Sequence, residues 1–156
     1  MTNTSSTQLA IIGAGPGGFT AAFLAADQGF NVTLIDTRPS LGGTCLHEGC
    51  IPSKALLSIV KTIDQAKTAE NFGVQFGAPQ IDLNKIKDFK NNVISKLSNG
   101  LLQLSKQKKI EFIQGAAGFL DSKTIEIKKV NGEKQPLAFK KCIIATGSEP
   151  TTLPFV

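Results

Sequence analysis

Two of the large aromatic residue types are missing from this chain, because its 156 residues include no tryptophan and no tyrosine. Aromatic packing therefore depends on 10 phenylalanines alone. A hydrophobic core must be built from these and from aliphatic side chains. With 41% hydrophobic and 19% charged residues, the composition is that of an ordinary globular domain and excludes wholesale disorder.

Cysteine is also scarce, and the sequence shows neither a long apolar run nor the pattern of a targeting leader. Three cysteines are too few for a disulfide scaffold, and in a reducing compartment a close pair is more often catalytic or metal-binding than structural. No apolar run approaches the ~18 residues that a membrane span requires. Residues 1–8 are rich in serine and threonine and carry no positive charge, unlike a secretory or transit leader. We expect a short flexible tail here and a cytoplasmic protein.

Positive charge is in modest excess, with a formal net charge of +5. The densest basic stretch, residues 106–109, contains three lysines and no interleaved aromatic residue. Nucleic-acid sites usually combine a basic face with aromatic or groove-reading residues, so we expect no nucleic-acid partner. The excess charge is interpreted as that of a mildly basic surface.

A βαβ unit is indicated near the N-terminus. Residues 9–12, Leu-Ala-Ile-Ile, form a short apolar run that predicts a buried strand. Residues 19–28 are rich in alanine and predict a helix that Gly29 would end. Residues 32–35, Val-Thr-Leu-Ile, predict a second buried strand, followed directly by Asp36. The length of about 30 residues predicts two parallel, neighbouring strands.

The turn inside this unit has the pattern GxGxxG, formed by Gly13, Gly15 and Gly18. In dinucleotide-binding proteins the first glycine permits a tight turn, the second admits the pyrophosphate and the third allows close packing of helix and strand. Asp36 stands near the expected place, about 20 residues on, for a carboxylate that binds ribose hydroxyls. The context favours dinucleotide binding over a ligand-free glycine turn, but the motif alone does not separate FAD from NAD.

Two further helices are predicted in the middle of the chain. Pro52 suits the first turn of one, and Asp82 is a candidate cap for the other. Their apolar residues recur at spacings of three and four, which indicates stripes packed against a core. The first stripe comprises Ala55, Leu56, Ile59, Val60, Ile63 and Ala66, and the second Leu83, Ile86, Phe89, Val93, Ile94, Leu97, Leu101 and Leu104.

Four strands are predicted in the last third of the chain. They cover residues 110–113, 124–130, 137–140 and 142–145, and a turn at Asn131-Gly132 separates the second from the third. Cys142 begins the last of these strands and is interpreted as a small buried hydrophobic residue.

Cys45 and Cys50 stand five positions apart in a glycine-containing loop before a helix. In a regular helix, residues five apart have Cα atoms over about 8 Å apart, whereas a disulfide needs about 7 Å or less. Pairing therefore requires a distorted backbone, which Gly49 would permit. A disulfide that closes so short a loop adds little to the stability of the fold, so its value would be redox chemistry. The start of a helix and the positive charge of Lys54 would favour a thiolate there. Metal binding and two inert thiols stay open as alternatives, and His47 is either a surface loop residue or a catalytic base.

The segment GGTCLHEGCIPSK, residues 42–54, resembles the active-site motif of the flavoprotein disulfide reductases. The GAGPGG turn before it and the ATGS strand end after it stand in the order that the family shows. Leu46, Ile51 and Ser53 make the chain more similar to the dihydrolipoamide dehydrogenases than to glutathione or mercuric reductases. The resemblance runs from Leu9 to the end of the chain.

This resemblance implies an α/β fold: a Rossmann-like FAD-binding domain with a parallel central sheet, helices packed on it and a small additional β-meander. It implies that residues 1–8 are a tail and that residues 9–156 are the N-terminal part of the FAD/NAD(P)-binding domain. The residues implied to bind FAD are Gly13, Gly15, Gly18, Asp36, Thr37, Arg38, Leu41, Gly42, Gly43, Thr44, Cys45, Lys54, Ala117, Thr146, Gly147 and Ser148. No metal site is implied.

The implied catalytic residues are Cys45 and Cys50. Dihydrolipoamide, carried on the lipoyl domain of a 2-oxoacid dehydrogenase complex, would attack their disulfide through Cys45. Cys50 would then pass electrons to the flavin, and NAD⁺ would be the final acceptor. The family's active form is a homodimer.

The chain departs from the family pattern at two residues and in its extent. Asp36 stands where the family usually has glutamate, and His47 replaces the commoner asparagine. The family's NAD domain, dimerisation domain and catalytic His–Glu pair have no counterpart in these 156 residues, so we expect no turnover by this chain alone. The alternatives are another flavoprotein disulfide reductase and a stand-alone, non-catalytic flavin-binding module.

Overall fold

The computed structural model describes residues 5–149 and 151–153. The chain forms two compact units, one comprising Met1–Gly43 with Leu101–Val156 and the other Thr44–Gly100. We call them the sheet unit and the helical unit. The strands are β1 (Ser5–Ile12), β2 (Val32–Asp36), β3 (Glu111–Phe119), β4 (Thr124–Lys129) and β5 (Lys134–Ile144). The helices are α1 (Pro16–Asp27), α2 (Gly43–His47), α3 (Cys50–Thr68), the short 3₁₀ helix η1 (Ala69–Phe72) and α4 (Leu83–Gln107).

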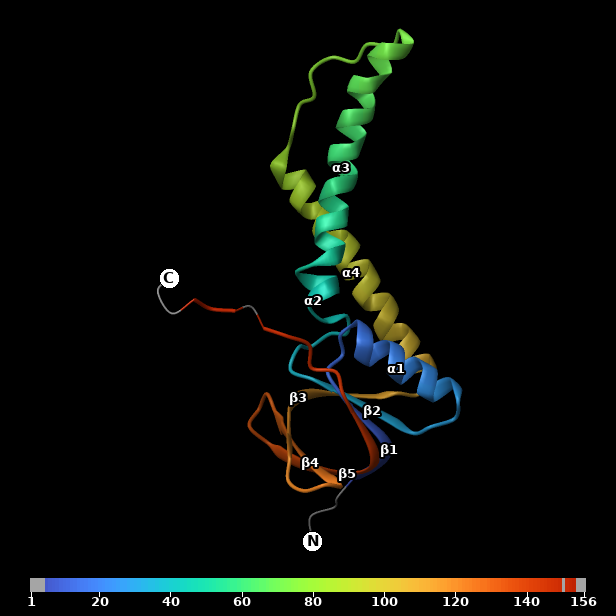
Figure 1. Cartoon of the computed structure of the whole chain (residues 1–156), viewed down its shortest axis with the longest axis vertical. Coiled ribbons are helices and arrows are strands. Elements are labelled where there is room, and N and C mark those ends of the chain that lie inside the picture. The colour runs from blue at the N-terminus through green and yellow to red at the C-terminus, as the bar shows by residue number, and fades with distance from the viewer. Residues whose placement is uncertain (1–4, 150, 154–156) are drawn as a thin grey trace. The chain divides into compact units, whose positions relative to one another are not determined.

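The sheet unit is mixed α/β, and its five strands close into a barrel (Figure 1). β1 lies parallel between β2 and β5, and β2 also pairs in parallel with β3. β4 is antiparallel to both β3 and β5 and closes the ring. The predicted βαβ unit is confirmed, because β1 and β2 are parallel neighbours connected through α1. The expected parallel sheet is present in β1, β2, β3 and β5, but the expected additional meander is not an appendage, because β4 pairs with both β3 and β5 and closes the same sheet.

Two long strands explain why the meander is not separate. β3 pairs with β2 through Thr33–Asp36 opposite residues 111–114, and then with β4 through residues 115–119. β5 pairs with β4 near its start and with β1 as far as Ile144. The two strands predicted at 137–140 and 142–145 are therefore one continuous strand, since Lys141 between them pairs with Leu9.

The core consists of two clusters on opposite faces of β1 and β2. Side chains alternate along a strand, so Leu9 and Ile11 contact the cluster around α1, whereas Ala10 and Ile12 belong to the cluster inside the barrel. Burial on both faces is why residues 9–12 form a continuous apolar run rather than an alternating one. The inner cluster is completed by side chains from all five strands; its buried members are Ala10, Ile12, Ile35, Ile113, Ile125, Ile127, Leu137 and Phe139.

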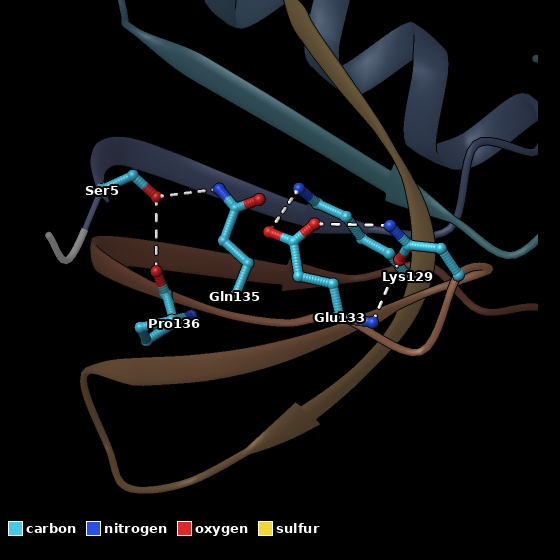
Figure 2. Close-up of polar contacts among 6 residues, drawn as sticks. Ser5, Lys129, Glu133, Gln135 and Pro136 are labelled. Atoms are coloured by element: carbon cyan, nitrogen blue, oxygen red, sulfur yellow. Dashed lines mark hydrogen bonds and ion pairs between the residues drawn. The ribbon is translucent and has the colours of Figure 1, made fainter. Parts of the chain in front are cut away.

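The N-terminal strand begins earlier than the sequence predicts. Residues 5–8, expected in a flexible tail, belong to β1, and Ser5 pairs with Leu137 of β5. The Ser5 hydroxyl donates to the carbonyl of Pro136 at 3.3 Å and accepts from the Gln135 amide at 3.2 Å (Figure 2). Residues 1–4 of the expected tail and residues 150 and 154–156 of the expected domain lie outside the described residues.

The predicted turn at Asn131-Gly132 is confirmed between β4 and β5. Gly132 has φ +84°, and the Lys129 N–H donates to the Glu133 carbonyl at 2.8 Å. The Lys129 ammonium contacts the Glu133 carboxylate at 3.2 Å (Figure 2). This contact, followed by the hydrogen bond from Asn131, holds the pKa of Glu133 below its usual value.

The helical unit confirms the predicted helix starts. Pro52 lies in the first turn of α3, and the Asp82 carboxylate caps α4 by accepting the N–H groups of Asn84 at 2.9 Å and Lys85 at 3.1 Å. Residues 74–82 have no regular structure. The predicted core packing of the stripes is confirmed at Ala55, which is buried, and at Leu101, which packs against the core cluster around α1, but it is wrong for six of the fourteen stripe residues. Leu56, Val60, Leu83, Phe89, Leu97 and Leu104 are exposed.

The reason is that residues 44–100 contain helices and a connecting segment but no sheet surface. A pair of helices alone leaves much of its apolar surface uncovered. In the described part of the chain, none of the helices combines the length and the hydropathy of a membrane span.

Candidate functional site

The glycine turn lies between β1 and α1 and is shaped by three close backbone approaches. Gly13 has φ +103°, and its N–H donates to the carbonyl of Ile35 at 2.7 Å. A Cβ on Gly13 would lie 2.2 Å from the carbonyl oxygen of Ala145, and one on Gly18 would lie 1.7 Å from the Gly13 oxygen. Neither position admits a side chain. Gly18 therefore has the packing role that the motif predicts, whereas Gly13 is confined by the end of β5 as well as by the turn.

Gly15, the middle glycine, lies against the loop that follows β2. It is the N-cap of α1, and Pro16 is the first residue of the helix. A Cβ on Gly43, which has φ +57°, would lie 2.6 Å from the Gly15 Cα. Two segments nearly 30 positions apart thus meet backbone to backbone, and the helix N–H groups beside them are left to bind an anion.

Asp36 ends β2 and is half-buried. One carboxylate oxygen accepts the Ala14 N–H at 2.6 Å, and the other accepts the Arg38 N–H at 2.9 Å. The acid therefore ties the glycine turn to the loop after β2. Each oxygen retains a second lone pair with which it can accept a hydroxyl.

A pocket of about 230 Å³ opens beside this carboxylate. Its walls come from four separate segments: the end of β1, the end of β2, the middle of β3 and the segment after β5. The lining residues are Ile12, Gly13, Ile35, Asp36, Thr37, Gly115, Ala116, Ala117 and Thr146. Five of the residues expected to bind a dinucleotide are thereby brought together: Gly13, Asp36, Thr37, Ala117 and Thr146. A volume of this size suits the nucleoside end of a dinucleotide rather than the whole molecule.

Several other expected cofactor residues support this pocket without lining it. Arg38 donates its N–H to Asp36, and Gly42, with φ +116°, donates its N–H to the Ala14 carbonyl at 2.9 Å. Leu41 is fully buried in the core cluster around α1, so its side chain is used for packing. Gly147, with φ +82°, and the exposed Ser148 follow Thr146 in the segment after β5.

Four lining residues were missed by the sequence reasoning. Ile12 and Ile35 are the apolar strand ends on either side of the turn, and Gly115 and Ala116 precede the expected Ala117. Gly115 carried a usable signal, because a glycine inside a strand often marks a close backbone approach. A Cβ there would lie 2.7 Å from Ile127 and 2.8 Å from the Lys128 carbonyl oxygen.

Cys45 and Cys50 lie in the helical unit on either side of a helix break. Cys45 belongs to the short α2, which was expected to be loop, and Cys50 is the first residue of α3. Gly49 separates the helices, with ideal-Cβ distances of 3.2 Å to the Thr44 carbonyl oxygen and 3.4 Å to the Cys45 Cα. This is the backbone distortion that the five-residue spacing requires for the two side chains to meet.

Both cysteines are present as thiols, and their side chains are hydrogen-bonded to each other. This bond raises the pKa of Cys45 above its ordinary value, with partial desolvation and the charge of Cys50 acting in the same direction. A backbone hydrogen bond from Cys50 and the nearby Lys54 ammonium oppose the rise. Such contact makes the pair a coupled dithiol that can lose two electrons and two protons to form a disulfide.

The remaining histidine and cysteine have other surroundings. His47 is half-buried and is the last residue of α2, so it lies in a short helix rather than in the loop that the sequence predicts. Cys142 is half-buried beside the inner core cluster, and burial raises its pKa. Within residues 5–149 and 151–153, no group of three or more His, Cys, Asp or Glu side chains could hold a metal ion.

Comparison with known protein families identifies one family for this arrangement of glycine turn and dithiol. The model described as pyridine nucleotide-disulphide oxidoreductase matches residues 7–156. The chain belongs to this family. Both the nucleotide-binding turn and the cysteine pair lie inside the matched region.

Individual members of the family are similar over nearly all of the chain. A dihydrolipoyl dehydrogenase of Haemophilus influenzae is 40% identical over 156 residues, which cover 100% of this chain and 33% of that protein. The dihydrolipoyl dehydrogenase of Buchnera aphidicola is 43% identical, and the match covers 96% of this chain and 32% of that protein. The dihydrolipoyl dehydrogenase of Bacillus subtilis is 45% identical, and the match covers 94% of this chain and 32% of that protein. The chain therefore spans about a third of the length of the curated relatives it matches.

Proposed function

We propose that this chain is the flavin-binding and redox-dithiol part of a dihydrolipoamide dehydrogenase. The observation that carries the proposal is the contact between the Cys45 and Cys50 thiols across the break at Gly49. A cysteine pair at the start of a helix and close to a lysine is suited to thiol–disulfide exchange rather than to stability. The relatives named dihydrolipoyl dehydrogenase support the choice of substrate.

FAD is the proposed cofactor, and the residues of the sheet unit fit its adenosine and pyrophosphate parts. Gly13, Gly15 and Gly18 leave the helix N–H groups open to a pyrophosphate, because no side chain stands in front of them. Asp36 offers carboxylate oxygens to ribose hydroxyls, and Thr37, Ala117 and Thr146 line the same pocket. We propose that residues 42–45 and Lys54 contribute to the flavin end.

The chemistry assigned to the cysteines is an exchange of two electrons. In the oxidised form, a thiolate of dihydrolipoamide attacks Cys45, the protein S–S bond breaks, and Cys50 leaves as a thiolate at the start of α3, where the helix dipole favours negative charge. The second substrate thiol then displaces Cys45, which completes the lipoamide disulfide and leaves the protein dithiol. FAD, when bound, would supply the electron acceptor for this dithiol, and NAD⁺ is the proposed final acceptor.

The partners proposed for the full-length protein are those that the family resemblance implies. A lipoyl domain of a 2-oxoacid dehydrogenase complex would deliver the substrate, and the full-length protein would act as a homodimer. The sequence of this chain contains a single GxGxxG turn, so we propose that NAD is bound elsewhere in the full-length protein. Turnover is therefore expected only from the full-length gene product.

The proposal is tested by the redox activity of the full-length gene product with dihydrolipoamide and, separately, with glutathione. We expect NAD⁺-dependent oxidation of dihydrolipoamide, and loss of this activity by more than about 10³-fold in Cys50→Ser. Cys142→Ser is the matched control, and it should retain activity because Cys142 lies in β5, outside the pair. Activity with glutathione alone would contradict the substrate, and full activity in Cys50→Ser would contradict the electron route.

Flavin binding by the present chain is a separate test. After addition of FAD and desalting, we expect retained flavin absorbance near one equivalent or a measurable dissociation constant by fluorescence quenching. A chain that is folded by circular dichroism yet shows no interaction with FAD would contradict cofactor binding by the sheet unit.

A further inference from the structure

The carboxylate of Asp36 is engaged by two backbone segments at once. Its oxygens accept the N–H of Ala14 at 2.6 Å, in the glycine turn, and the N–H of Arg38 at 2.9 Å, in the loop after β2. Both bonds are charge-assisted, and such bonds are about twice as strong as neutral ones. Asp36 therefore does more in this fold than present a free carboxylate to the pocket.

Ala14 is held at both of its backbone groups. Its N–H is bound to Asp36, and its carbonyl accepts the N–H of Gly42 at 2.9 Å. Ala14 is fully buried, so its peptide groups face protein rather than a ligand. Pro16 has no N–H, and the first N–H groups of a helix lack intrahelical partners. Gly17 and Gly18 are therefore the residues whose N–H groups can meet a pyrophosphate, and their direction depends on how Ala14 is held.

The length of the acid decides whether both bonds can form. The bond from Arg38 to Asp36 joins residues i+2 and i, a local Asx turn that aspartate and asparagine make readily. Glutamate carries the same charge on a side chain one methylene longer. It can still reach toward a ribose, but it cannot keep the same short contacts to both Ala14 and Arg38. Asparagine keeps the length but has only one acceptor oxygen.

We propose that Asp36 is a positioning residue for the pyrophosphate-binding turn. Its carboxylate fixes the backbone at Ala14 and thereby aims the N–H groups at the start of α1 toward the anion. This inference rests on the proposed flavin site and extends it, because it assigns to Asp36 an effect on nucleotide binding that does not pass through the ribose.

The test compares two nucleotides on the apoprotein of the full-length gene product by titration calorimetry. ADP carries ribose hydroxyls and a pyrophosphate, whereas 2′,3′-dideoxy-ADP keeps the adenine and the pyrophosphate but lacks both ribose hydroxyls. We expect Asp36→Glu to weaken both ligands by a similar factor of about tenfold, the loss of one charge-assisted hydrogen bond. Asp36→Asn, which keeps the side-chain length, should weaken dideoxy-ADP in the same direction.

A matched control is available at Asp121, whose carboxylate accepts the N–H of Lys123 at 2.7 Å in the same i to i+2 geometry. Asp121→Glu removes an equivalent Asx turn between β3 and β4 and should leave both affinities unchanged. A loss of affinity in this control equal to that in Asp36→Glu would show a general effect on stability and overturn the positioning role.

The second readout is the Ala14 amide in a ¹H–¹⁵N spectrum. A short bond to a carboxylate shifts this proton downfield and protects it from exchange, so we expect both effects in the wild type and their loss in Asp36→Asn. If the wild type and Asp36→Glu bind dideoxy-ADP equally well, the positioning role of Asp36 is overturned, while the proposed flavin site is not. A wild-type protein that binds neither FAD nor ADP would instead overturn the proposed flavin site, while the Ala14 signal would still test the contact.

Discussion

Cys45 is the residue whose chemistry depends most directly on a neighbour. Its pKa is raised mainly by the hydrogen bond with Cys50, so Cys50→Ala should lower it. The pH profile of alkylation by iodoacetamide, followed at Cys45 by mass spectrometry, measures this shift. We expect the midpoint for the wild type to lie above that of an ordinary thiol and the midpoint for Cys50→Ala to lie below that of the wild type.

A substitution of Lys54 is the control that should shift the Cys45 alkylation midpoint in the opposite direction. Its ammonium lowers the pKa of Cys45, so Lys54→Met should move the alkylation midpoint upward. Identical profiles for the wild type and Cys50→Ala would show that the two thiols are not in contact in solution.

Gly13 is restricted both by its positive φ and by its close contact with Ala145. Gly29 shares only the first of these restrictions, so comparing the two glycines separates the effects. Both have positive φ, +103° and +82°, but a Cβ on Gly13 would lie 2.2 Å from Ala145 whereas one on Gly29 meets nothing within 4 Å. Gly29→Ala should lower the free energy of unfolding by about 1–2 kcal/mol, the cost of a left-handed residue. Gly13→Ala adds the clash and should cost more than about 3 kcal/mol. Urea unfolding followed by far-UV circular dichroism measures both, and equal losses would contradict the close approach of Ala145 to Gly13.

At the scale of the element, β3 contains two glycines in different surroundings. A Cβ on Gly115 would lie 2.7 Å from Ile127, whereas one on Gly118 meets nothing within 4 Å. We expect Gly115→Ala to lower the free energy of unfolding by about 1–3 kcal/mol because the barrel interior is close-packed. Gly118→Ala in the same strand should be neutral or slightly stabilising. Equal effects of the two substitutions in urea unfolding would contradict the pairing of β3 with β4.

At the scale of the whole molecule, the sheet unit is assembled from both ends of the chain. β1 and β2 precede residues 74–82, β3, β4 and β5 follow them, and the pairings β1–β5 and β2–β3 join the two sides. This connecting segment is exposed and has no regular structure, and Phe76 within it is an accessible chymotrypsin site.

Brief chymotrypsin treatment should therefore cut the chain near Phe76 without separating the fragments. We expect one peak on native size exclusion, with the retention volume of the intact chain, and two bands on a denaturing gel. Elution in 6 M urea is the control that releases the fragments. Separate peaks under native conditions would contradict the sheet order.

The sequence by itself determined the local features of this protein. The GxGxxG turn, Asp36 at the end of β2, the cap at Asp82 and the turn at Asn131-Gly132 all appear where the residues predict them. Each depends on backbone preferences and hydrogen bonds within a few positions, which the residue types express directly. The cysteine spacing likewise required a distorted backbone, and the break at Gly49 provides it.

Only the tertiary structure decided how distant segments meet. Ala117 and Thr146 join Gly13 and Asp36 at one pocket, β4 closes the sheet into a barrel, and the Ala145 carbonyl confines Gly13. These contacts are made largely by backbone groups, which every residue carries, and between segments up to more than a hundred positions apart. Residue types therefore leave them unspecified, and the pairing of strands and the packing of the core select them.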